Sequence, residues 1–387
     1  MTSLRESFLN LFSTVEPIPA GTYHYIAPPE DPRNYRLHLR LELDGKGILI
    51  VNASTILHLN ETAAEYAYHL VICTPEDQVA KTISSRYRIS SSQALQDYQE
   101  LVDRIDTLVT TPDLDPVMFL NFERQEPYSG HIIAPYRLDC ALTYRLPEGI
   151  DPDFAPTKRV TRELSTEEWK IILDKSWEIG IPHIIFSGGE PTLREDLVAL
   201  IEKAEENGQV TGLLTDGFHL GNKEYLDSLL QTGLDHILFI LHPEIEHAWI
   251  SLQSVLNEDI YTAVHLTMTP LNIDGFHDLI HKLKELNVCA ISLSATSESL
   301  DTDLESARDL VAELKIDLVW DIPVPYSSHN PVAVEIEADE IDIHEGSGRA
   351  WLYVEPDGDV LPAQEINKVL GNFLTDTWEQ IWSHHEE

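Results

Sequence analysis

Cysteine is scarce in the 387-residue sequence: there are only three, Cys73, Cys140 and Cys289, and they lie far apart in the chain. A disulfide framework needs several cysteines at short spacings, and a C-x-x-C metal site needs two cysteines in one short segment. The sequence has neither pattern. It therefore indicates isolated thiols that pack as small hydrophobic side chains.

Basic residues are also few, with 26 Lys and Arg against 66 Asp and Glu, which gives a net charge of −40. So acidic a chain repels nucleic-acid phosphates and anionic lipids, and we expect it to bind neither nucleic acid nor membrane. No apolar run approaches the ~18 residues of a membrane span. The N-terminal "MTSLRESFLNLFSTVEP" lacks the apolar core of a signal peptide. We therefore expect a cytoplasmic protein.

Strand and helix patterns follow one another regularly in what remains. After an N-terminal extension, residues 1–30, the segment 31–125 opens with "YRLHLRLEL", whose apolar and polar residues alternate as in a half-buried strand. The turn sequence "DGKG" and the run "ILIVN" predict a hairpin. Three helical patterns follow, the first with Asn60 as N-cap. The segment predicts a small winged-helix-like α+β domain.

The stretch "GILIVNASTILHLNETAAEYAYHLV" resembles the PqqD-like family, whose members bind precursor peptides for modifying enzymes. The resemblance implies that this domain recognises a peptide or a segment of a partner protein. A two-stranded hairpin leaves backbone groups unpaired at its edge, so we expect the peptide to pair with the second strand unless residues 1–30 cover it. The expected binding residues are Ile48, Leu49, Ile50 and Val51 on that strand and Leu95, Tyr98 and Leu101 on the third helix.

Residues 132–325 alternate apolar strand patterns with helical ones. The strand patterns are "LDCALTY", "HIIFS", "TGLLT", "HILFIL", "TAVHLTM", "CAISLS" and "KIDLVW". Repeated strand-then-helix units predict an α/β fold with a parallel sheet, open or curled toward a barrel. In such sheets ligands bind at the C-terminal ends of the strands. The motifs "SGGEP" and "TDG" each follow one of these strands.

The combination "LTYRLPEGI…IGIPHIIFSGGEPTLREDLVALI…GLLTDGFHL…TGLDHI" resembles the radical S-adenosylmethionine superfamily. The resemblance implies a partial (βα)6-type parallel barrel. It also implies that the GGEP turn holds the amino end of the methionine part of S-adenosylmethionine, because glycines allow a close backbone approach and a carboxylate adds charge. The implied cofactor-binding residues are Gly188, Gly189, Glu190, Pro191, Thr215 and Asp216, the last standing where the family usually has Asn.

The sequence departs from that family at the loop after the first barrel strand, where a C-x-x-x-C-x-x-C motif holds a 4Fe-4S cluster. Leu146, Ile150 and Asp153 occupy the three ligand positions, and Cys140 belongs to the preceding strand. Iron–sulfur clusters take soft thiolate ligands. We therefore expect no 4Fe-4S cluster, no catalytic or metal-binding residue, and only weak binding of S-adenosylmethionine.

The tail, residues 345–387, contains "WLYVEPDGDVLPAQEINKVLGNFLTDTWEQIW" and resembles the SPASM-like extension of many radical enzymes. In that extension "DGDVLPC" supplies a ligand to an auxiliary cluster, and this chain has Ala363 at that position. The lost cysteine in the tail repeats the loss in the barrel loop, which favours loss of redox chemistry throughout the chain.

Two further groups of residues could bind metal. His277 and His281 are four residues apart, but the apolar residues of their helix leave both on the solvent side. The acidic segment 332–348, "VAVEIEADEIDIHEGSG", could bind a cation such as Ca²⁺, but it lacks the glycine-pivoted spacing of a calcium loop. We interpret the first as a solvated helix face and the second as an exposed connector.

Together these patterns indicate a degenerate radical S-adenosylmethionine fold that serves as a non-catalytic peptide-binding or scaffold subunit beside an active radical enzyme. Two alternatives remain open. The chain could be an active radical enzyme whose cluster has atypical ligands. Alternatively, the barrel could serve another small molecule.

Overall fold

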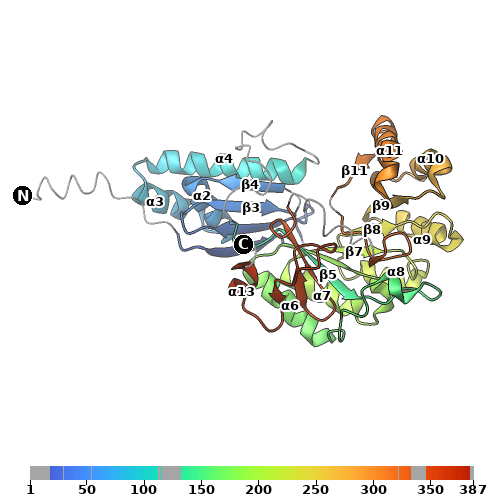
Figure 1. Cartoon of the computed structure of the whole chain (residues 1–387). Helices are drawn as coiled ribbons and strands as arrows, with labels where there is room; N and C mark the ends of the chain where they lie inside the picture. The colour runs from blue at the N-terminus through green and yellow to red at the C-terminus, as the bar shows by residue number, and fades with distance from the viewer. Residues whose placement is uncertain are drawn as a thin grey trace, which may run out of the picture. The chain divides into compact units, whose positions relative to one another are not determined.

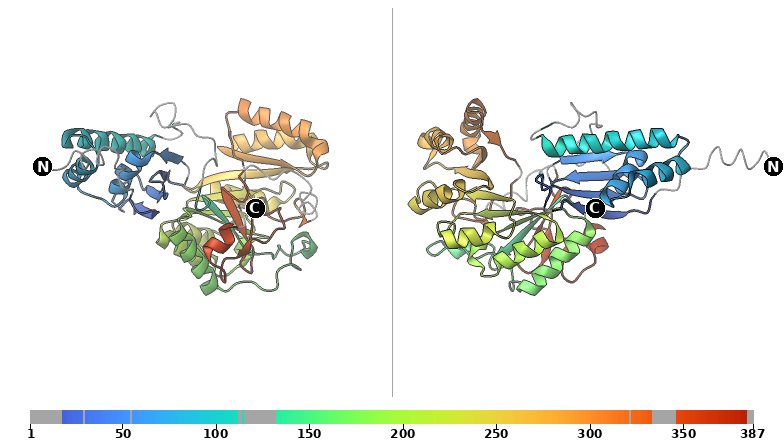
Figure 2. Two further views of the ribbon diagram at one scale, coloured as in Figure 1. Left: turned by 60° about the vertical axis from the view of Figure 1, so that its left-hand side comes forward. Right: turned by 180° about the vertical axis from the view of Figure 1, so that it is seen from behind.

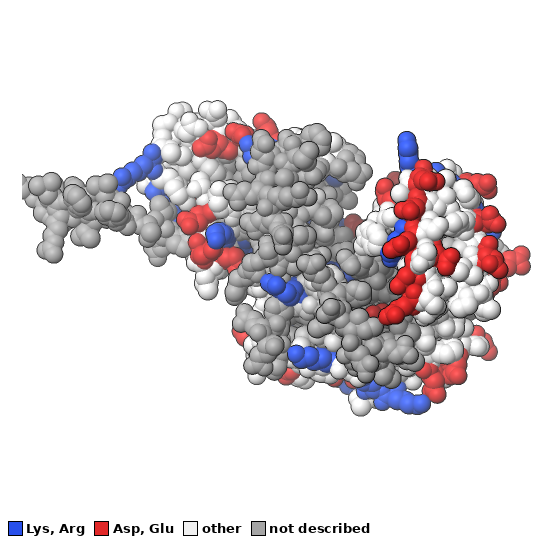
Figure 3. All heavy atoms as spheres, turned by 45° about the horizontal axis from the view of Figure 1, so that its top comes forward, with Lys and Arg blue, Asp and Glu red and all other residues white. Residues whose placement is uncertain are grey.

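The computed structural model describes residues 18–28, 30–53, 55–111, 114, 132–320, 322–332 and 346–383 (Figure 1). Contacts between Cα atoms divide the chain into two compact units, Met1–Ser129 and Gly130–Glu387. No helix among these residues is both long enough and apolar enough to span a bilayer. The strongly acidic composition is visible at the surface, where acidic side chains follow the exposed side of one helix, Asp301–Glu313 (Figure 3).

The first unit is a four-stranded antiparallel sheet covered on one face by three helices (Figure 1). The first helix begins after Asn60, whose side chain accepts a hydrogen bond from the Ala63 N–H, as the sequence predicts. The apolar residues that alternate along the strands, such as Leu39 and Leu49, pack on these helices. The elements are β1 Gly21–Ile26, β2 Arg36–Leu41, β3 Gly47–Val51, β4 Thr55–Leu59, α2 Glu61–Val71, α3 Glu76–Arg86 and α4 Ser91–Thr110.

The prediction of a two-stranded hairpin with an open second strand is wrong. Strand β3 is an interior strand that pairs with β2 on one side and with β4 on the other. The sequence reading missed β1 and β4 because "GTYHYI" and "TILHL" are short and carry mixed polar residues. Of the seven residues expected to bind a peptide, only Leu95 is more than slightly exposed; the buried ones are Ile48, Leu49, Ile50, Val51, Tyr98 and Leu101. They are packed in the interior of the unit and form no open groove.

The second unit contains the predicted parallel barrel strands, and their order along the sheet follows the chain. The sheet curves into a partial barrel with helices on its outer side (Figure 2). All seven sequence-predicted strands are present, which confirms the α/β fold class with a partial parallel barrel. The strands are β5 Arg137–Thr143, β6 His183–Gly188, β7 Val210–Thr215, β8 His236–Ile240, β9 Tyr261–Met268, β10 Ala290–Ala295 and β11 Asp317–Leu318; the helices are α6 Thr166–Ile179, α7 Leu197–Asn207, α8 Lys223–Leu230, α9 Glu246–Leu256, α10 Phe276–Glu285 and α11 Asp301–Glu313.

Alternation along the strands separates two cores in this unit. Residues such as Ile184 and Phe186 of β6 pack against the helices. Their neighbour Ile185 faces the other side, with Leu214 and Leu238 from the next two strands. At the C-terminal ends of the strands this inner side becomes polar, and the candidate site lies there.

The tail is part of the barrel sheet. Strand β12, Trp351–Val354, pairs parallel with β5, and β13, Asp359–Leu361, and β14, Gly371–Asn372, extend the sheet in the antiparallel sense. The last helix, α13 Trp378–Ser383, carries two indoles that bond to the start of the unit: Trp378 donates to the Ile133 carbonyl at 3.0 Å and Trp382 to the Ile132 carbonyl at 3.1 Å. Both ends of the unit are therefore fixed to each other.

The structure tests only one of the two further groups that could bind metal. His277 and His281 are exposed on α10, whose buried residues are Phe276, Ile280 and Leu283, so the interpretation as a solvated face is confirmed. Residues 333–345 of the acidic segment lie outside the described residues.

Candidate functional site at the barrel mouth

The GGEP turn follows β6 and is bonded to the end of β5. The Gly189 N–H donates to the Thr143 carbonyl at 2.8 Å and the Glu190 N–H to the Arg145 carbonyl at 2.9 Å. Gly188 has φ of +141°, and a Cβ there would lie 2.1 Å from the Thr143 carbonyl oxygen. Glycine is required at this position by both its conformation and the close backbone approach. The turn is thereby held at the mouth of the barrel.

Glu190 is fully buried and is the centre of this turn. Its carboxylate accepts hydrogen bonds from the Thr192 N–H at 2.9 Å, from the Thr215 hydroxyl at 2.8 Å and from the Asp216 N–H at 2.9 Å. The Thr192 hydroxyl donates to it as well. Glu190 thus joins the turn after β6 to the turn after β7. The structure brings together Gly188, Gly189, Glu190, Pro191, Thr215 and Asp216, as the sequence motifs predict.

Asp216 is a second carboxyl group beside Glu190. Burial raises the pKa of Asp216 well above its usual range, and the charge of Glu190 raises it further. Glu190 is buried and Asp216 is half-buried beside it, so the two carboxyl groups do not both ionise readily and Asp216 holds its proton more tightly than a free aspartate does. A protonated Asp216 can donate a hydrogen bond as the amide of asparagine does. This explains how the TDG sequence keeps a donor at a position where the family usually has Asn.

A buried histidine lies farther along the inner side of the sheet. His265 of β9 has its Nδ1 3.1 Å from the Ser292 hydroxyl and its Nε2 2.9 Å from the Ser294 hydroxyl. Burial, with a smaller effect from His242, lowers the pKa of His265 to about 3. The imidazole is therefore neutral and bonded to hydroxyls of β10. Sequence reasoning missed it, although the polar residues at alternate positions of "AVHLT" and "AISLS" are the signal of a polar inner face.

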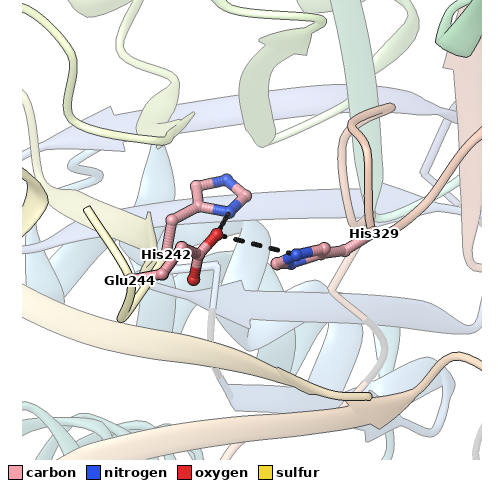
Figure 4. A group of neighbouring side chains, drawn as sticks. All are labelled: His242, Glu244 and His329. Atoms are coloured by element: carbon pink, nitrogen blue, oxygen red, sulfur yellow. Dashed lines mark ion pairs between the residues drawn. The ribbon is translucent and has the colours of Figure 1, made fainter. Parts of the chain in front are cut away.

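Two histidines and a carboxylate lie together at the same mouth. His242 is the second residue after β8, Glu244 is two residues further on, and His329 comes from the segment after β11 (Figure 4). The Nδ1 atom of His242 is 3.8 Å and the Nε2 atom of His329 is 3.7 Å from the same carboxylate oxygen, Oε1 of Glu244. Burial is the main cause that lowers the pKa of His242 to about 4. Sequence reasoning missed this group because His329 is distant in the chain from His242 and Glu244.

The tail places another buried carboxylate near the end of β5. Glu355 accepts a hydrogen bond from the Tyr144 hydroxyl at 2.7 Å and pairs with the Arg159 guanidinium at 2.6 Å. Burial raises the pKa of Glu355, and Arg159 opposes that effect. Together with Asp357 and Asp359 it forms a group of three acids whose ligand atoms lie within 4.8 Å of one another. The buried acid of the three, Glu355, is already paired with the Arg159 guanidinium, so no metal ion is needed to explain its burial.

The loop after β5 contains the three positions that bear cysteines in the radical family. Leu146 packs with a small apolar cluster, Ile150 is half-buried, and Asp153 is exposed and pairs with Lys158 at 3.1 Å. Cys140 is fully buried among helix-facing residues, and burial raises the pKa of its thiol well above the usual range. The donors of this loop therefore do not fit a thiolate-bound cluster there.

Comparison with known proteins shows what the barrel is similar to. Residues 140–242, which lie in the second unit, match the family model described as the Radical SAM superfamily. A protein named PqqA peptide cyclase from Rhizobium meliloti (strain 1021) is 28% identical over 288 residues, which cover 65% of this chain and 74% of that protein. Another PqqA peptide cyclase, from Bradyrhizobium diazoefficiens, is 44% identical over 79 residues, which is 20% of each chain.

Solved structures show the same fold. SuiB of Streptococcus suis bound to S-adenosylmethionine superposes with a TM-score of 0.56 at 15% identity, covering 93% of this chain and 88% of that one. SuiB bound to its precursor peptide SuiA gives the same TM-score. At this identity the likeness concerns the fold, and it supports the arrangement of a small antiparallel-sheet domain before a partial barrel.

These comparisons contradict two expectations from the sequence. The chain was expected to be a non-catalytic scaffold, but the proteins it resembles in sequence are named as peptide cyclases. It was also expected to lack a 4Fe-4S cluster and to bind S-adenosylmethionine weakly, whereas its barrel matches a superfamily that the cofactor defines. Both expectations rested on three loop positions, and that loop alone does not determine whether the protein is an enzyme.

Proposed function

We propose that this chain is an enzyme that binds S-adenosylmethionine at the mouth of its barrel and modifies a peptide. One observation carries the proposal: the fully buried carboxylate of Glu190 lies directly after the two-glycine turn and beside the carboxyl group of Asp216. S-adenosylmethionine has an ammonium and a sulfonium group. A buried negative charge at the C-terminal end of parallel strands favours such a cation.

Within this proposal the cofactor site consists of residues that the GGEP and TDG motifs provide. Glu190 has a double role because the hydrogen bonds that orient its carboxylate also fix the two turns. The raised pKa of Asp216 favours its neutral form, which limits the negative charge of the pair. The family's cluster positions hold no cysteine, so any iron–sulfur cluster of this enzyme takes ligands from outside that loop.

A peptide substrate is supported by the relatives. Relatives in sequence are named PqqA peptide cyclase, and SuiB has been solved bound to the precursor peptide SuiA. In this proposal residues 31–125 are a PqqD-like peptide-recognition domain, residues 345–387 are a SPASM-like tail, and the enzyme acts in the cytoplasm. The edges of the small sheet are β1 and β4 among the described strands, so an added peptide strand would pair with one of these and not with β3.

The experiment is calorimetric titration of the full chain with S-adenosylmethionine, using Glu190→Gln and the control Glu195→Gln. Glu195 is exposed in the same turn sequence, so its substitution removes a charge without touching the buried pair. We expect wild type and Glu195→Gln to bind equally and Glu190→Gln to bind at least tenfold more weakly, about 1.4 kcal/mol.

Turnover is a separate readout. The chain, reconstituted anaerobically with iron and sulfide, should consume S-adenosylmethionine in the presence of a reductant, as followed by chromatography. Absence of binding to the wild-type chain would overturn the proposal. If Glu190→Gln bound S-adenosylmethionine as tightly as the wild type, the Glu190 carboxylate could not be the basis of the proposed site.

A further inference from the structure

His242, Glu244 and His329 form a group that the proposed cofactor site does not use. The ligand atoms of the three side chains lie within 4.8 Å of one another. Both histidine nitrogens approach the same Glu244 oxygen, at 3.8 and 3.7 Å, which is longer than a hydrogen bond. The three groups therefore point toward a common position without bonding directly to each other (Figure 4).

The backbone around two of these residues is fixed by local hydrogen bonds. The Ile245 N–H donates to the His242 carbonyl at 3.0 Å, which closes a turn directly after β8. The Ser327 hydroxyl oxygen accepts from the His329 N–H at 3.2 Å, and the Asn330 side chain donates to the Val324 carbonyl at 2.8 Å. The donors are thus placed by the fold before any ligand arrives, as a binding site requires.

The distances suit a metal ion. Metal–nitrogen and metal–oxygen bonds of about 2.0 to 2.2 Å place tetrahedral ligand atoms about 3.3 to 3.6 Å apart. The observed 3.7 and 3.8 Å exceed this by only a few tenths of an ångström. The two imidazole nitrogens lie within 4.8 Å of each other, so modest side-chain rotations would bring all three donors to coordination distance.

We propose that His242, Glu244 and His329 bind one divalent first-row transition-metal ion, such as Zn²⁺ or Fe²⁺. Two imidazoles and one carboxylate are donors that such ions prefer, whereas Mg²⁺ and Ca²⁺ prefer oxygen ligands alone. The Glu244 side chain is 57% exposed and the His329 side chain 24%. Three protein ligands on one side and solvent on the other leave coordination positions open to the mouth, as in catalytic metal sites.

The competing explanation is a weak contact between an imidazole and a carboxylate at the surface, which would hold no metal. Metal binding by the full chain separates the two. The protein is stripped of metal with a chelator and titrated with Zn²⁺ in competition with a chromophoric chelator, and the bound metal is counted by elemental analysis. Binding of Co²⁺ is followed in parallel by its visible absorption, which reports histidine ligation.

The variants are Glu244→Gln and His329→Ala, with His281→Ala as the control. His281 is exposed on α10, so its replacement tests whether any surface histidine contributes equally. We expect about one Zn²⁺ per wild-type chain, an affinity at least tenfold lower in both site variants, and no change in the control. Because Glu244 is exposed, Glu244→Gln keeps the test valid even if His329→Ala folds poorly.

Equal Zn²⁺ affinity in wild type and Glu244→Gln would overturn the site, as would wild-type protein that binds no Zn²⁺. The inference does not depend on the proposed function, since the titration contains no S-adenosylmethionine. Conversely, the Glu190→Gln substitution that tests the cofactor site leaves all three proposed ligands in place.

Discussion

The backbone N–H of Asp216 donates to the Glu190 carboxylate at 2.9 Å, which links the loops that follow two adjacent barrel strands. The carboxyl group of Asp216 lies beside that of Glu190, and the charge of Glu190 raises the pKa of Asp216, so the protonation of Asp216 affects how the two loops are held together. The stability of the barrel mouth is therefore a function of pH, and the contribution of Asp216 can be isolated by substitution.

Asp216→Asn should stabilise the protein at neutral and alkaline pH. A carboxyl whose folded pKa is raised above its unfolded value binds a proton more tightly in the folded state, so the wild type loses stability as pH rises from about 4 toward the folded pKa. Asparagine retains a donor and has no such loss. Thermal unfolding at pH 8 should show a gain of at least about 1 kcal/mol, roughly 2 °C or more in Tm, that vanishes near pH 4.

A difference between Asp216→Asn and wild type that is the same at pH 4 and pH 8 would contradict the shared proton. Asp227→Asn on α8 is a suitable control. That residue forms a surface pair with Lys223, so its replacement should change the stability little across this range.

Gly188→Ala should destabilise the barrel by about 2 to 4 kcal/mol. The added Cβ would lie 2.1 Å from the Thr143 carbonyl oxygen, and a φ of +141° is unfavourable for alanine. Gly275→Ala is the matched control, because a Cβ there meets nothing within 4 Å. Urea unfolding of both variants measures the difference, and an equal loss in both would show that the turn is less constrained than described.

His265 should make the metal-free protein less stable in acid. A histidine with a folded pKa of about 3 remains neutral while the unfolded chain takes up a proton below about pH 6.5, so stability falls as pH falls through this range. His265→Gln should reduce the slope of the unfolding free energy against pH by up to about 1.4 kcal/mol per pH unit, which corresponds to one proton taken up on unfolding. Urea unfolding from pH 4.5 to 7.5 gives the slopes, and the exposed His281→Gln should keep the wild-type slope.

Ile50→Pro should unfold the small sheet. Ile50 pairs with His38 on one side and with Ile56 on the other, and its side chain is fully buried. Proline in an interior strand removes a backbone donor and should cost about 3 kcal/mol or more. Hydrogen exchange should increase in residues 36–59 while the barrel strands keep their protection. Unchanged protection of β2 to β4 would contradict the interior position of β3.

The barrel was predictable because each of its strands is an apolar run followed by a helix pattern, and two turns carry recognisable sequences. Local chemistry also fixes the GGEP turn, since only glycine fits at Gly188 and the Glu190 carboxylate needs neighbouring donors. Such features depend on residues close in sequence or on strands whose order follows the chain.

The rest depended on pairing between distant segments. Strand β4 turns β3 into an interior strand, and this cannot be inferred from the composition of "ILIVN" alone. His242 and His329 meet only because the segment after β11 returns to the end of β8. The missing cysteines were conspicuous in the sequence, but they described one loop and led to a wrong conclusion about the whole protein.

The bonds from Trp378 and Trp382 to the carbonyls of Ile133 and Ile132 bring the first and last described residues of the barrel unit together. A short linker could therefore join these two points, and new termini could be opened in a loop at the opposite end of the barrel from the mouth, such as the one between α10 and β10. Such a circular permutant should retain the parallel pairing of β12 with β5, since that pairing depends on the closure of the unit and not on the order in which its strands are synthesised.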